Sequence, residues 1–138
     1  MSLAEIAALP VAKLVAPNAH LHFWTTTSFL WDAKPIMEAW GFTPKSQLVW
    51  CKPWGTGHYW RIAHEILLLG VRGRATFRHH GLRSWFECGR GAHSDKPDQV
   101  RHWIEAVSPA PYLELFGRRP APGWTVFGDT IEHTLFER

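Results

Sequence analysis

The segment that most constrains the fold is residues 65–71, EILLLGV, which is almost continuously apolar. Runs of this length and composition are typical of strands that are covered on both faces, as the central strands of parallel sheets are. Residues 19–25 and 46–51 are rich in aromatic and β-favouring side chains and predict two further strands. The segment 28–40 lies between them and has the apolar stripe of a helix, with Ser28 suited to cap its start and Gly41 to follow its end. Strands that alternate with helices indicate an α/β fold with a mostly parallel, doubly wound sheet.

Local signals define the ends of the chain. Ser2 and Glu5 fit a capping box, so a short helix is expected to begin at the first residues. Pro97 and Asp98 suit the first turn of a later helix. Further strands are expected at residues 84–87, 112–116 and 124–128. Because no internal repeat or linker interrupts the pattern, residues 1–138 predict a single domain.

Composition excludes a disordered chain and indicates the class of partner. Apolar residues make up 46% of the sequence, and a net charge of +3 favours an anionic partner such as nucleic acid. The nine tryptophans offer flat surfaces for stacking a base, although core packing is the expectation for most of them. Cys51 and Cys88 are the only cysteines, and the sequence has no signal peptide and no run of 18 apolar residues. We therefore expect a reducing, cytoplasmic location and no membrane partner.

Polar and aromatic groups follow the predicted strands. Open α/β sheets bind ligands beyond the carboxyl ends of their strands. Three segments meet that condition, namely residues 50–60, 93–98 and 117–119. The stretch 52–64, KPWGTGHYWRIAH, is glycine-bearing, aromatic and basic, which predicts a functional surface loop.

Five motifs occur in a fixed order along the chain. They are Leu48-Val49-Trp50-Cys51-Lys52, His64-Glu65, His93-Ser94-Asp95-Lys96-Pro97-Asp98, Glu114-Leu115-Phe116-Gly117-Arg118 and Gly123-Trp124. Together they resemble the MT-A-type adenine-N6 methyltransferases, a family that includes the eukaryotic messenger-RNA enzyme and bacterial and phage relatives. The resemblance implies a Rossmann-like, S-adenosylmethionine-dependent methyltransferase fold that is incomplete at its N-terminus. It also implies methylation of the exocyclic amine of adenine in DNA or RNA.

The catalytic signature of that family, Asp-Pro-Pro-Trp, is absent, because the sequence contains no two adjacent prolines. In relatives the signature lies upstream of the stretch that resembles residues 2–10, so Met1 is expected to be an internal methionine of a longer reading frame. Residues 51–54, CKPW, follow a different strand and carry no carboxylate, so they do not replace it. No catalytic residue is assigned, and the chain alone is expected to be inactive or impaired.

The resemblance assigns three residues to the nucleic-acid substrate. Trp50 matches an indole that helps to sandwich the target adenine; the alternative is a buried strand tryptophan. Lys52 is expected near a phosphate or, equally, in solvent at the strand end. Glu65 stands in an apolar run, where an unpaired carboxylate is costly, so it needs a partner or lines the pocket.

The resemblance assigns a second group to the cofactor. Lys96 matches a lysine that contacts the methionine end of S-adenosylmethionine, and the alternative is a surface lysine at a helix start. The others follow the last strands and would contact the ribose and the cofactor's tail: Glu114, Arg118, Arg119, Asp129 and Thr130. Arg119 departs from the family pattern, and Asp129 and Thr130 replace an asparagine-containing pair.

Two other features allow further interpretations. Histidine pairs at His20/His22 and His79/His80 lack cysteine or carboxylate ligands at zinc spacing, so no metal site is predicted. The basic segment 72–83 is expected to contact nucleic acid or to be a solvated loop.

The resemblance also leaves a non-enzymatic interpretation open. Family members pair an active subunit with a degenerate one, and residues 52–64 correspond to a region used for that pairing. A homodimer or heterodimer through this loop, with the chain as a nucleic-acid-binding or scaffolding partner, is therefore the alternative to an enzyme. A decayed gene fragment is a third interpretation.

Overall fold

The computed structural model of the chain describes residues 1–89, 96–117 and 119–128. The chain divides into two compact units, Met1–Ser108 and Pro109–Arg138. The expectation of one partial methyltransferase domain over residues 1–138 stays a prediction.

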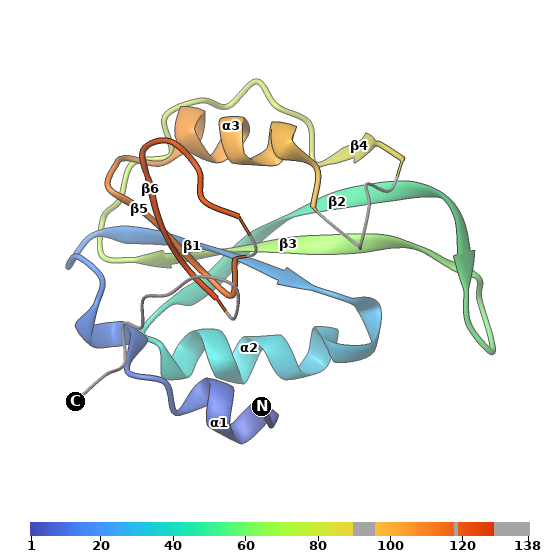
Figure 1. Cartoon of the computed structure of the whole chain (residues 1–138), viewed down its shortest axis with the longest axis horizontal. Helices are drawn as coiled ribbons and strands as arrows, with labels where there is room; N and C mark the ends of the chain where they lie inside the picture. Colours follow the sequence, from blue (N-terminus) through green and yellow to red (C-terminus); the bar gives the residue numbers. More distant parts are fainter. Residues whose placement is uncertain (90–95, 118, 129–138) are drawn as a thin grey trace. The chain divides into compact units, whose positions relative to one another are not determined.

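The first unit contains a mixed four-stranded sheet with the order β1-β3-β2-β4 (Figure 1). Its strands are β1 (Ala19–Thr25), β2 (Thr43–Thr56), β3 (Ile62–Arg72) and β4 (Trp85–Glu87). Strand β3 is antiparallel to both of its neighbours, whereas β4 is parallel to β2. Strands β1, β2 and β4 therefore share one direction, and their carboxyl ends lie at the same edge of the sheet.

The expectation that the sheet is mostly parallel is wrong for β3. Strands β2 and β3 extend further toward each other than predicted, so only residues 57–61 connect them. A connection this short can join only antiparallel strands, because a parallel pair needs a crossover of a dozen or more residues. Gly57 has a φ of +136°, a backbone conformation that side-chain-bearing residues rarely adopt, and it lies in this tight turn. The predicted loop over 52–64 is therefore largely a β-hairpin.

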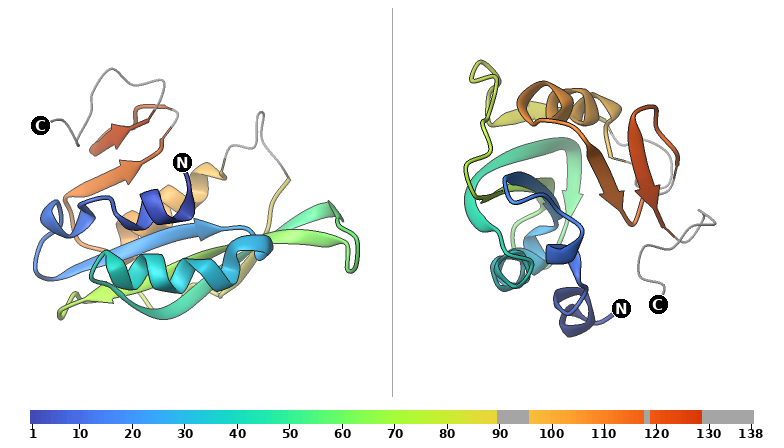
Figure 2. Two further views of the ribbon diagram at one scale, coloured as in Figure 1. Left: turned by 90° about the horizontal axis from the view of Figure 1, so that it is seen from below. Right: turned by 90° about the vertical axis from the view of Figure 1, so that its left-hand side faces the viewer.

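Helices cover both faces of this sheet. Helices α1 (Leu3–Ala7) and α2 (Leu30–Ala39) lie on one side and α3 (Asp98–Val107) on the other (Figures 1 and 2). Short 3-10 turns, η1 (Val11–Lys13) and η2 (Thr27–Phe29), complete the unit.

The helix ends test the predicted caps. The Ser2–Glu5 capping box is confirmed, with both reciprocal hydrogen bonds at 3.1 Å. Gly41 has a φ of +91° and follows the end of α2, as its position predicts. Ser28 was expected to cap α2, but it lies in η2, and no side chain caps α2 at Phe29.

The core on the α2 side depends on one close approach to the sheet. Ala33, Ile36 and Met37 are buried beneath α2. Gly70 on β3 faces them, and a Cβ atom there would lie 2.8 Å from Met37 Cε and 3.0 Å from Phe42 Cβ. The break in the apolar run at Gly70 is thus the space into which α2 packs.

A polar cluster joins the end of α3 to β1. His20 Nδ1 and His22 Nε2 lie 2.7 and 2.8 Å from the hydroxyl of buried Ser108. His20 Nε2 lies 3.2 Å from the Ala75 carbonyl oxygen, which can only accept, so this nitrogen carries the proton. His20 Nδ1 then accepts from Ser108 Oγ, and Ser108 Oγ accepts from His22 Nε2. The adjacent histidines are structural within this cluster.

The second unit contains two parallel strands, β5 (Tyr112–Leu115) and β6 (Trp124–Phe127). Tyr112 and Trp124 stack with ring centroids 5.0 Å apart. The Gly117 amide donates to the Phe127 carbonyl at 2.8 Å, and a Cβ at Gly117 would lie 2.3 Å from Glu114 Oε1. Glu114 is therefore held close to the turn that follows β5.

Candidate functional site

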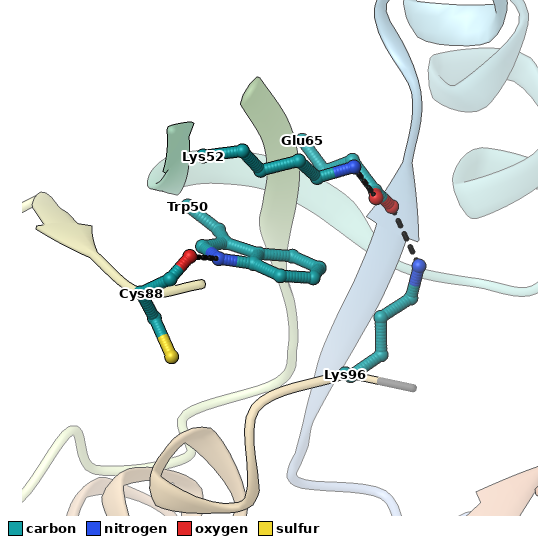
Figure 3. Close-up of polar contacts among 5 residues, drawn as sticks. All are labelled: Trp50, Lys52, Glu65, Cys88 and Lys96. Carbon is teal, nitrogen blue, oxygen red and sulfur yellow. Dashed lines mark hydrogen bonds and ion pairs between the residues drawn. The ribbon is translucent and has the colours of Figure 1, made fainter. Parts of the chain in front are cut away.

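One group of aromatic and charged side chains lies where the carboxyl ends of β1, β2 and β4 meet. It consists of Trp24, Trp50, Lys52, Glu65 and Lys96, and we call it the Glu65 cluster. Trp50 pairs with Glu65 across β2 and β3, so the two residues share one face of the sheet. Lys96 reaches the same face from the residues before α3 (Figure 3).

Glu65 is the centre of this cluster. It is buried, and its two carboxylate oxygens accept separate bonds, Oε2 from Lys52 and Oε1 from Lys96 at 2.5 Å (Figure 3). Burial raises the pKa of Glu65, but hydrogen bonds from Lys52 and Lys96 and their charges outweigh it, so its pKa lies below the usual value. Glu65 therefore stays ionised near neutral pH, as the predicted need for a partner required.

Trp50 is a buried side chain in this structure, with 1% of its surface exposed. Its indole Nε1 donates to the Cys88 carbonyl at 2.8 Å, just beyond β4 (Figure 3). Trp24 meets it edge-on, with centroids 6.0 Å apart and planes at 72°. The indole is therefore fixed in orientation, which is the geometry of a buried strand tryptophan.

Ammonium groups lie over the tryptophan rings. Lys52 Nζ is 4.7 Å from the Trp50 centroid, and Lys96 Nζ is 5.3 Å from the Trp24 centroid. These cation–π contacts add to the ion pairs with Glu65. A base that stacked on Trp50 would have to displace an ammonium group, and Lys96, whose side chain is 40% exposed, moves more easily than Lys52 at 10%.

The structure brings together only some of the predicted site residues. Trp50, Lys52 and Glu65, assigned to substrate, share one cluster with Lys96, assigned to cofactor. Glu114 and Arg119 belong to the second unit. Arg118, Asp129 and Thr130 lie outside the described residues.

Two arginines of the basic segment 72–83 form hydrogen bonds with backbone carbonyls elsewhere in the first unit. Arg72 donates to the Ala12 carbonyl at 2.9 Å, and Arg78 donates to the Glu105 carbonyl at 2.8 Å and to the Ser108 carbonyl. These guanidinium groups hold backbone carbonyls in the first unit.

Among the described residues, no group of three or more His, Cys, Asp or Glu side chains is arranged to hold a metal ion. No helix in that part of the chain is long and apolar enough to cross a membrane.

Two members of the site were not predicted from the sequence. Trp24 was assigned only to a buried strand, and the Cys88 carbonyl was not considered. The position of Trp24 near the carboxyl end of β1 was the available signal, because strand ends converge in α/β sheets. The Cys88 contact depends on β4 lying beside β2, which nothing local to residue 88 reveals.

The first unit is a mixed α/β unit with an aromatic and charged cluster at its strand ends, the edge at which open α/β sheets bind ligands. The family model described as MT-A70 matches residues 1–130. The chain belongs to the MT-A70 family of adenine-N6 methyltransferases.

Three relatives illustrate the breadth of this family. The type II methyltransferase M.MunI of Mycoplasma sp is 30% identical over 99% of this chain and 61% of its own length. The N(6)-adenosine-methyltransferase MT-A70-like protein of Drosophila melanogaster is 28% identical over 96% of this chain and 24% of its own length. The human N(6)-adenosine-methyltransferase catalytic subunit METTL3 is 25% identical over 83% of this chain and 22% of its own length. The chain thus spans less than two thirds of each of these relatives.

Proposed function

We propose that this chain contributes to S-adenosylmethionine-dependent methylation of the exocyclic amine of adenine in DNA or RNA, within a Rossmann-like methyltransferase domain. The observation that carries the proposal is the Glu65 cluster, in which the residues assigned to substrate contact Lys96, one of the residues assigned to the cofactor. The activities named for its relatives support the reaction class.

The chemistry demands a site that holds the adenine amine tightly. Its lone pair is delocalised into the ring, so the amine is a poor nucleophile and depends on positioning and on acceptors for its hydrogens. Trp50 is buried, so a base would stack on it only after the partly exposed Lys96 ammonium moved away, with Trp24 and the Lys52–Glu65 pair beside it. A duplex substrate would also require the target base to leave the stack.

The residues present fit S-adenosylmethionine. A partly exposed ammonium at Lys96 suits a carboxylate, and the carboxylate of Glu114 suits ribose hydroxyls. Arg118, Arg119, Asp129 and Thr130 complete the proposed cofactor set. When bound, the cofactor supplies a methyl group on a positively charged sulfur.

We further propose that residues 1–138 alone transfer methyl groups poorly. They contain no Asp-Pro-Pro-Trp, and so lack the acceptors that this tetrad supplies in the family. The second candidate function, an inactive nucleic-acid-binding or scaffolding partner, draws on this absence and on the exposed aromatic residues of segment 52–64. That segment would then join two chains in a homodimer or heterodimer.

Free thiols at Cys51 and Cys88 are consistent with the proposed cytoplasmic location.

Isothermal titration with S-adenosylmethionine tests the proposal. We expect saturable binding that Lys96→Ala and Arg118→Ala each weaken about tenfold, since each removes a charge-assisted contact of about 1.5 kcal/mol or more. Lys45→Ala, which removes an exposed lysine near the start of β2, is the control and should bind normally. Absence of binding by the unaltered chain would contradict the cofactor assignment.

A methyl-transfer assay separates the two candidate functions. Cofactor binding without methyl incorporation into an adenine-containing oligonucleotide favours the inactive partner. Incorporation that appears when an upstream, in-frame Asp-Pro-Pro-Trp segment is restored identifies the enzyme.

A further inference from the structure

The hairpin formed by β2 and β3 continues beyond the rest of the sheet. Strand β1 pairs with β3 only as far as Ile66, and β4 pairs with β2 only as far as Cys51. Among the described strands, residues 52–64 pair only within β2 and β3, and we call them the outer hairpin. It extends past β1 and α2 in two orthogonal views (Figures 1 and 2).

The outer hairpin exposes its largest side chains. Trp54, Tyr59 and Trp60 are 76%, 94% and 85% exposed. Large aromatic side chains gathered on one short element are unusual on a surface and indicate a binding site. Each ring is available for a flat partner to stack on.

Charge indicates what kind of partner this is. Residues 52–64 contain no Asp or Glu, whereas Arg61 lies beside the aromatic residues. A shallow hollow of about 530 Å³ lies against the hairpin, and its lining combines apolar Val49 and Ile66 with Lys52 and Arg61. Lys52 is paired with Glu65, so Arg61 is the cation that remains beside the exposed aromatic side chains, in a segment without carboxylates. This combination suits an anionic partner that carries flat rings.

The position of the outer hairpin connects it to the Glu65 cluster. Trp50 and Glu65 lie at its base and Lys52 at its first position, so one continuous β-ribbon leads from the cluster to the exposed aromatics. Trp54 follows Trp50 by four residues, which corresponds to about 13 Å along an extended strand. If the target base of a polynucleotide occupied the Glu65 cluster, a nucleotide only a few positions away along the strand would reach Trp54.

We infer that the outer hairpin is a stacking platform for unpaired bases that flank the target adenine. Trp54, Tyr59 and Trp60 are the stacking surfaces, and Arg61 faces the phosphates of the nucleic acid. This inference rests on the proposed function, because it requires a nucleic-acid substrate. It adds a site that neither the Glu65 cluster nor the cofactor residues supply. A second protein chain is the competing partner, but the hairpin's glycines and basic residues provide little aliphatic surface for one.

Fluorescence anisotropy with a labelled, single-stranded, adenine-containing oligonucleotide tests the inference. We expect Trp60→Ala to raise Kd about tenfold, within the fivefold to 150-fold range that corresponds to about 1–3 kcal/mol per stacked base. Trp60→Phe should restore most of the affinity, because it keeps an aromatic face. The same sequence as a duplex should bind more weakly than the single strand, since its bases are already stacked.

Trp31→Ala is the matched control. Trp31 is 84% exposed, as Trp60 is, but it lies on α2. Its substitution should leave Kd unchanged. An equal loss of affinity in Trp31→Ala and Trp60→Ala would overturn the inference, because oligonucleotide binding would then not be specific to the outer hairpin.

Two further measurements separate the inference from its competitors. If Trp60→Ala changes the sedimentation of the chain but not its affinity for the oligonucleotide, the outer hairpin is a protein interface and the inference is wrong. S-adenosylmethionine binding by Trp60→Ala should match that of the unaltered chain. Oligonucleotide affinity that is insensitive to the hairpin, alongside intact cofactor binding, overturns the inference while the proposed function stands.

Discussion

At the scale of single residues, Glu65 shows how a buried carboxylate can be kept in an apolar strand. Two lysines from different elements share its oxygens, and 8% of the residue's surface is exposed. The two pairs are unequal, because Lys52 is almost buried whereas Lys96 is partly exposed. Removing the charge of Glu65 and removing that of Lys96 should therefore have different consequences.

We expect Glu65→Gln to lower the free energy of unfolding by about 3 kcal/mol, because it leaves the Lys52 ammonium buried without an anion. Lys96→Ala should cost less than about 1 kcal/mol, since its pair with Glu65 is screened by solvent. Urea denaturation measures both. Adding Lys52→Met to Glu65→Gln should recover part of the loss, and equal costs for the two single variants would contradict this account.

At the scale of elements, the hairpin of β2 and β3 depends on one glycine. A Cβ atom at Gly55 would lie 1.9 Å from the backbone oxygen of Ile62, so no side chain fits there without separating the strands. This close approach adjoins the register shift between Cys51 and Thr56. Gly55 thus determines whether the outer hairpin forms.

Gly55→Ala should open the outer hairpin while the rest of the first unit stays folded. Amide hydrogens of residues 56–62 should exchange about tenfold faster or more, which corresponds to about 1.4 kcal/mol of local stability. Gly89→Ala is the control, because a Cβ there meets nothing within 4 Å. Unchanged exchange in Gly55→Ala would show that the strands tolerate the added methyl group.

At the scale of the whole first unit, the cluster of His20, His22 and Ser108 makes stability depend on pH. Burial lowers the pKa of His20 below its usual value, and burial with the nearby His20 lowers the pKa of His22 to about 4. A histidine whose pKa is lower in the folded state binds its proton preferentially in the unfolded state. Stability is therefore lost as pH falls from the unfolded pKa to the folded one.

We expect the free energy of unfolding to fall between about pH 6.5 and about pH 4, by up to about 3 kcal/mol for His22. Urea titrations across this range measure it. His22→Gln should flatten the profile, because an amide can donate to Ser108 without titrating. A profile as steep in His22→Gln as in the unaltered chain would place the titrating groups elsewhere.

Features that depend on nearby residues could be predicted from the sequence alone. The bounds of β1, the capping box at Ser2 and the glycine after α2 were predicted correctly, because side-chain alternation and capping act within a few residues. The apolar run around Glu65 also identified it as a carboxylate that needs a partner or lines a pocket. Its burial among apolar neighbours was legible without any knowledge of the fold.

The direction of β3 and the membership of the Glu65 cluster could not be predicted from local sequence and follow from the folded chain. An apolar run occurs in both parallel and antiparallel strands, so it does not predict the direction of β3. That direction follows from the short connection at residues 57–61. Lys96 meets Glu65 because the residues before α3 reach this face of the sheet, and Trp24 on β1 meets Trp50 on β2 across the intervening β3. Contacts of that kind arise from hydrogen bonding and burial between elements. The residues adjacent in sequence to each partner therefore do not predict them.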